Sequence, residues 1–137
     1  MISNQSIRRS TAVILIGLTL GIHVGDAFAD EANGWSPDAL ELRVLPKYCQ
    51  AQFLNLAPPQ VTPMSLCGIY ANHLCPGMVL VNRASKFSIP KHLRQRIAKM
   101  ARGEIAYTKK HINPRCPLTP DLAVTDARLR NLEISLK

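Results

Sequence analysis

Four cysteines and a neighbouring histidine have the clearest capacity for chemistry in this chain. The cysteines are separated by 18, 8 and 41 residues, and they are Cys49, Cys67, Cys75 and Cys116. Their spacing contains no C-x-x-C redox pair or C-x-x-C-H haem site, and it resembles no zinc module. His73 and Cys75 could hold copper or zinc together if the Cys75 thiol were free. If Cys75 is oxidised, His73 packs beside a disulfide instead.

The remaining residues show no spacing typical of a catalytic site. The sequence has no recognisable Ser-His-Asp or Cys-His arrangement, no glycine-rich phosphate loop and no pair of working carboxylates. We therefore predict a protein that is not an enzyme and that needs no cofactor.

The first 29 residues have the three parts of a signal peptide. Arg8 and Arg9 form a positive n-region, the apolar segment 11–21 follows, and Ala27-Phe28-Ala29 is an A-x-A cleavage signal. The apolar segment is short for a bilayer span, so an uncleaved membrane anchor is the less favoured alternative. The sequence therefore predicts export to the periplasm or the exterior, with no transmembrane segment left after cleavage.

Residues 30–137 are expected to form a single small domain. A domain of this length buries roughly two thirds of the surface that its unfolded chain exposes, which makes a lean core. In an oxidising compartment the four cysteines are expected to pair. Four cysteines allow three connectivities, and their spacing alone does not choose among them.

Proline positions and apolar periodicity predict an all-α domain of about four helices arranged as hairpins. Ser-Pro or Thr-Pro pairs, typical of a helix N-cap followed by its first residue, occur at 36–37, 62–63 and 119–120. We expect a first helix over 37–45, a short helical turn within 46–59, and a second helix from Pro63. Pro76 should kink or break that helix near Cys75, and it should resume over 77–85.

The two remaining helices are predicted over 90–111 and from Pro120 onward. In the first, an apolar arc of about 120° contains Leu93, Ile97, Met100, Ala101, Tyr107 and Thr108. The last helix carries Leu122, Leu129, Leu132 and Leu136 at helical spacing. No segment alternates long enough to predict a strand.

Positive charge is concentrated in one stretch of the chain. Ten lysines and arginines lie between Arg83 and Arg115, against the single acid Glu104, within an overall net charge of +8. Opposite the apolar arc we expect a basic face that favours anionic partners, consisting of Lys91, Lys99, Arg102, Lys109 and Lys110. The simpler alternative is a solvated face that aids solubility. Nucleic acid is an unexpected ligand, because only Phe87 and Tyr107 interleave the cations as stacking platforms.

Glu104 interrupts the apolar arc of the predicted helix. A buried carboxylate without a partner costs several kcal/mol, so we expect an ion pair, with Arg83 on the preceding helix as the partner. The alternative, a general acid with a raised pKa, has no second catalytic residue near it in the sequence.

Three segments resemble exported bacterial tetratricopeptide-repeat proteins. They are LPKYCQAQF (45–53), HLCPGMVLVNRAS (73–85) and ARGEIAYTKKHI followed by PLTPDL (101–122). The chain is similar to the cysteine-containing region that opens such proteins, cut to about one and a half repeats. It departs from the family pattern at Leu74 and Pro76, where aromatic residues are usual, and in having two further cysteines.

The resemblance implies a disulfide pairing and supports a functional prediction. It makes Cys49 the partner of Cys75, which leaves Cys67 for Cys116, and such staples would replace the missing repeats. Together with the absence of reaction chemistry and the basic face, the resemblance leads us to expect a helical adaptor that binds another protein with an acidic surface, for example as an accessory subunit of an envelope complex. Two alternatives stay open: a copper- or zinc-handling protein using His73 and a thiolate, and a binder of anionic envelope polymers.

Overall fold

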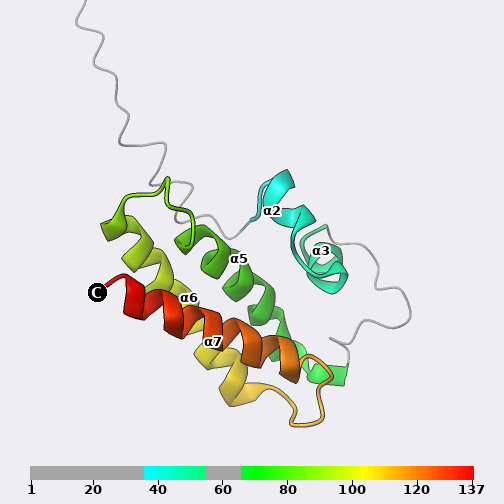
Figure 1. Cartoon of the computed structure of the whole chain (residues 1–137). Coiled ribbons are helices and arrows are strands. Elements are labelled where there is room, and N and C mark those ends of the chain that lie inside the picture. The colour runs from blue at the N-terminus through cyan, green and yellow to red at the C-terminus, as the bar shows by residue number, and fades with distance from the viewer. Residues whose placement is uncertain (1–35, 55–65) are drawn as a thin grey trace, which may run out of the picture.

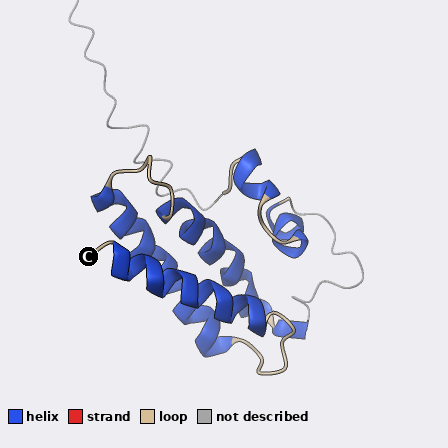
Figure 2. Ribbon diagram, in the orientation of Figure 1, coloured by secondary structure: helices blue, strands red, loops and turns tan. Residues whose placement is uncertain are grey.

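A computed structural model of the chain describes residues 36–54 and 66–137. The predicted signal peptide, residues 1–29, lies outside these ranges. Within them every regular element is a helix, which agrees with the all-α prediction (Figure 2). Among the described helices, none combines the length and the apolar character that crossing a bilayer requires.

Three helices form the main body of the fold: α5 (Leu74–Ala84), α6 (Lys91–His111) and α7 (Thr119–Ser135). They lie side by side with alternating direction, and each packs against the other two (Figure 1). Their facing surfaces supply fully buried side chains that include Leu80, Ile97, Ile105 and Leu129. The leucines predicted for the last helix, Leu122, Leu129, Leu132 and Leu136, are all buried, which confirms that part of the pattern.

Two short helices lie beside α5: α2 (Ala39–Arg43) and α3 (Lys47–Phe53). The first begins later than the predicted 37–45 because Asp38, and not Ser36, is the N-cap. The Asp38 carboxylate accepts from the backbone N–H of Glu41 at 2.7 Å, and the Glu41 carboxylate accepts from that of Asp38 at 3.1 Å. This reciprocal capping box satisfies two backbone donors, which a serine followed by proline cannot match here.

The segment before α5 contains Gly68, whose φ of +81° is in the region that favours glycine. A 3₁₀ helix, η1 (Ile69–His73), then leads directly into α5. Pro76 is the third residue of α5, where its missing N–H would have no intrahelical acceptor in any case. The change from 3₁₀ to α-helix at Leu74 is the break predicted near Cys75, and Pro76 lies in the first turn of the α-helix that follows.

Helix α6 matches its predicted range, but its buried face is rotated by about 60°, at about 100° per residue. The rotation follows from its position between α5 and α7, which buries Ala98 and Ile105 as well as Ile97 and Ala101. Tyr107, predicted to point into the core, is 39% exposed. Its ring lies 4.4 Å from that of His73 and 4.5 Å from that of His111, measured between centroids.

Two disulfides attach the outlying segments to this body. Cys49–Cys75 joins α3 to α5, and Cys67–Cys116 joins the segment before η1 to the loop between α6 and α7. The Cα–Cα distances are 5.3 and 4.6 Å, and all four residues are buried. This is the pairing that the family resemblance implies.

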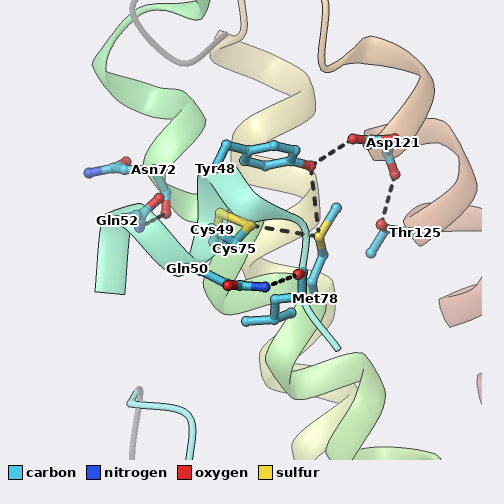
Figure 3. Close-up of a disulfide and its surroundings, with 10 residues drawn as sticks. Tyr48, Cys49, Gln50, Gln52, Asn72, Cys75, Met78, Asp121 and Thr125 are labelled. Carbon is cyan, nitrogen blue, oxygen red and sulfur yellow. Dashed lines mark hydrogen bonds between the residues drawn. A yellow bond between two sulfur atoms is a disulfide. The ribbon is translucent and has the colours of Figure 1, made fainter. Parts of the chain in front are cut away.

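The Cys49–Cys75 bond is reinforced by a contact between α3 and α7. The Tyr48 hydroxyl donates a 2.8 Å hydrogen bond to the Asp121 carboxylate (Figure 3). Burial and this hydrogen bond both raise the pKa of Tyr48, so its hydroxyl keeps the proton that it donates. Side chains of α3 therefore contact both α5 and α7. These contacts hold the two short helices at one edge of the three-helix body.

Candidate protein-binding face of helix α6

The five cations predicted to share one basic face separate into two groups. Lys91, Lys99 and Lys110 are exposed, and no ion pair joins them to any described acid. Arg102 and Lys109 instead point toward α7 and are held there by its carboxylates. Four of the five predicted cations are exposed and Arg102 is partly buried, but only three of them carry no ion pair to a described acid.

Asp126 is the centre of the α6–α7 charge cluster. Its buried carboxylate accepts from Arg102 at 2.6 Å, and from Lys109 and Arg130 at 2.9 Å. Arg102 also binds Glu133 at 2.6 Å. The hydrogen bond from Lys109 outweighs burial and, with that from Arg102, lowers the pKa of Asp126. Arg102 and Lys109 therefore link α6 to α7, whereas Arg130 pairs with Asp126 within α7.

The solvent side of α6 carries the remaining charges. We define the α6 outer face as one stripe of exposed residues at helical spacing: His92, Arg96, Lys99, Gly103, Ala106 and Lys110. Arg96 belongs to this stripe although the sequence prediction did not select it, since the predicted wheel was rotated. Two small residues, Gly103 and Ala106, separate Lys99 from Lys110. The stripe therefore has accessible cations on either side of a central stretch where the side chains are small.

The carboxylates of the described part are already engaged within the protein. Asp38 caps α2, and Asp121 accepts from Tyr48. Glu41, Asp126 and Glu133 form ion pairs, and the Glu104 carboxylate lies 2.7 Å from the His73 ring nitrogen. In residues 36–54 and 66–137 no acid is left over to neutralise the α6 outer face.

The predicted ion pair between Arg83 and Glu104 is wrong in its partners. Both residues are buried, as expected, but Arg83 binds Glu41 of α2 at 2.8 Å. Glu104 instead lies 2.7 Å from the Nδ1 atom of His73. The short α2 helix, which folds back onto the C-terminal half of α5, supplies the acid that Arg83 binds.

The arrangement around His73 differs from the one needed for a metal. Cys75 is bonded to Cys49, so it offers no thiolate in this oxidised form. The His73 ring contacts Glu104 and Tyr107. In the described part of the chain, no three His, Cys, Asp or Glu side chains come close enough together to hold a metal ion.

Comparison with known proteins assigns neither a family nor a function to the chain. No family model, curated protein or solved structure matches the chain.

Proposed function

We propose that this protein is a secreted or periplasmic, non-catalytic helical adaptor that binds an acidic surface of another protein through the α6 outer face. The resemblance to the cysteine-containing segment of exported tetratricopeptide-repeat proteins, and the export signal in the sequence, support this proposal. The two buried disulfides are compatible with an oxidising compartment.

One observation carries the proposal. Arg96, Lys99 and Lys110 are exposed on a single helix face, while the acids of the described part have partners elsewhere. Cations of this kind speed the encounter with a partner of opposite charge and select against a basic one. By contrast, Arg102 and Lys109 each bind carboxylates of α7, so we assign the binding role to the outer face.

An anionic envelope polymer is the second candidate for the same cations. A polymer would bind mainly through charge, so its affinity would fall steeply as salt is added. A folded acidic protein would also bury Gly103 and Ala106, and part of its affinity would persist at high salt. The metal-handling alternative is less favoured because it requires a Cys75 thiolate.

The proposal is tested by quantitative capture from the native envelope fraction. A variant with Arg96, Lys99 and Lys110 changed to Glu is compared with wild type. A matched control carries Arg43, Lys47 and Arg115 changed to Glu, which gives the same net charge with exposed residues outside α6. We expect wild type and the control to retain one stoichiometric protein partner, and the α6 variant to lose it.

Two results would contradict the proposal. If both charge-reversed variants lose the partner equally, net charge and not the α6 outer face controls binding. If only polymer is retained, with complete release on adding salt, the polymer function replaces the adaptor function.

A further inference from the structure

A groove between α6 and α7 continues the α6 outer face. It has a volume of about 210 Å³ and lies near the C-terminal end of α7. Ala98 and Leu136, both almost fully buried, contribute its apolar surface, and Lys99 and Lys137 lie at its rim. The Gln95 side chain also lines the groove and donates a 2.8 Å hydrogen bond to the Leu136 carbonyl. Lys99 belongs both to the groove and to the outer face.

The lining of this groove favours a ligand that is apolar and anionic together. Its charged side chains are Lys99, Arg102, Lys137 and Glu133. Arg102 and Glu133 already bind each other, so the cations available to a ligand are Lys99 and Lys137. A carboxylate next to an aliphatic side chain would pair with a lysine at the rim while the aliphatic group enters the groove.

Gly103 gives the neighbouring surface an unusual shape. A Cβ atom built at Gly103 would meet no atom within 4 Å, so packing within the protein does not require glycine here. Glycine is unfavourable inside a helix, and an alanine would be accommodated. Ala106 follows one turn later on the same face. Together they leave a shallow place at which the backbone of a second helix can approach α6 closely.

We propose that the occupant is an acidic amphipathic helix of the partner protein, with one aliphatic side chain seated in the α6–α7 groove. This inference rests on the proposed adaptor function and specifies the partner segment. Lys99 and Lys110 are eleven residues apart, which is about 16 Å along a helix. The partner helix therefore carries one carboxylate near its aliphatic anchor and a second about three turns away. Its side chains facing Gly103 are small.

A synthetic peptide of defined sequence pattern provides the probe. It is an acetylated, amidated helix of about 18 residues, with a Leu anchor, a Glu beside it and a second Glu three turns away. A comparison peptide has the Leu changed to Ala. Binding to the ¹⁵N-labelled, disulfide-bonded protein is followed by changes in backbone amide NMR shifts. We expect shifts around Ala98, Lys99, Gly103 and Leu136, and affinity at least about fivefold weaker for the comparison peptide.

Protein variants locate the contact. Gly103→Gln places a long side chain in the space above α6. It should weaken the affinity for the peptide with the Leu anchor about tenfold while leaving the fold intact. Lys99→Glu should weaken it similarly by charge repulsion. Lys47→Glu on α3 makes the same charge change elsewhere and should leave affinity within about twofold.

The outcomes separate this inference from the adaptor proposal. If both peptides bind equally and Gly103→Gln has no effect, the groove and the helical anchor are wrong, whereas an acidic partner on the outer face remains. If neither peptide binds but the native partner is still lost on reversing Arg96, Lys99 and Lys110, the inference about the segment fails alone. If that native partner is also retained, both fail.

Discussion

The Arg83 guanidinium holds the Glu41 carboxylate with three hydrogen bonds, from Nε to both carboxylate oxygens at 2.9 and 3.1 Å and from Nη2 to Oε2 at 2.8 Å. Lys86 adds a fourth contact at 2.9 Å, and Arg83 also donates to the Ser36 carbonyl. Glu41 and Arg83 are both only 4% exposed. This buried pair therefore joins α2, a helix of only five residues, to the C-terminal end of α5.

Removing the charge of Glu41 is therefore expected to destabilise the protein strongly. Glu41→Gln removes the buried negative charge that Arg83 and Lys86 bind and should lower the free energy of unfolding by about 3 kcal/mol. Urea unfolding of the oxidised protein measures the change. Glu133→Gln is the control, because that residue is one-third exposed and should cost less than about 1 kcal/mol. Equal losses in the two variants would mean that the buried pair adds no stability.

The same pair predicts a specific loss of stability in acid. Burial alone would raise the pKa of Glu41, but hydrogen bonds from Arg83 and Lys86 outweigh burial and lower it from 4.5 to about 2. Because the folded pKa is the lower one, this contribution is present above pH 4.5 and is lost as the pH falls toward 2. It amounts to about 3 kcal/mol at 1.36 kcal/mol per pKa unit.

Unfolding free energies of wild type and Glu41→Gln, measured from pH 6 to pH 2, check this prediction. The difference between the two proteins should shrink as the pH falls from about 4.5 to about 2. A difference that stays constant over this range would contradict the lowered pKa.

The close approach of α5 and α6 at Gly77 predicts opposite effects for two glycine substitutions. A Cβ at Gly77 would lie 2.7 Å from Ile105 Cδ1, and Ile105 is fully buried, so it has little room to move. A Cβ at Gly103 meets nothing. Gly103→Ala should stabilise α6 by up to about 1 kcal/mol, and Gly77→Ala should be less stable than Gly103→Ala by about 1–3 kcal/mol.

Thermal melts of the two glycine variants measure this difference. Adding Ile105→Val removes the clashing methyl group, so the cost of Gly77→Ala should fall in that background. No change in that cost would show that the clash with Ile105 is not its cause.

The disulfides are expected to contribute unequally to local order. They close loops with sequence separations of 26 and 49 residues, and each should add about 3–4 kcal/mol on the chain-entropy account. Replacing Cys49 and Cys75 by Ala should also loosen α2 and α3, since this removes the covalent link and leaves only non-covalent contacts, among them the Glu41 pair and the Tyr48–Asp121 bond. Hydrogen exchange should then be faster in α2 and α3 than in α6. Uniformly faster exchange in all helices would contradict this division.

The sequence anticipated the elements that depend on local patterns. Repeated leucines and Thr119-Pro120 located α7 to within a residue of its start, and the predicted range 90–111 matches α6 to within one residue. It missed relationships that depend on which helices become neighbours. The buried face of α6 was misplaced because packing between two helices buries Ala98 and the Arg94 stem, residues that a hydrophobicity pattern does not select.

The candidate site shows the same limit. The excess of cations in residues 83–115 was visible in the sequence. Which of them form ion pairs with acids of α7, and which remain accessible to a partner, was not. Asp126 and Glu133 lie on α7, distant in sequence from Arg102, and only their packing shows that they neutralise it. Similarly, a five-residue helix gave no periodic signal strong enough to suggest Glu41 as the acid for Arg83. The spacing of His92, Arg96, Lys99 and Lys110 on one stripe could have been found by drawing the wheel for charges alone.

In-cell photo-crosslinking from the α6 outer face tests the central claim most directly. A photoreactive residue at Ala106 lies between Lys99 and Lys110, and the same residue at Ala123, exposed on α7, serves as the control. Both variants are expressed in the native cells and irradiated. The adaptor account predicts one discrete crosslinked protein from position 106, reduced by Lys99→Glu and absent from position 123. The same products from both positions, or none from position 106 at full expression, would contradict it.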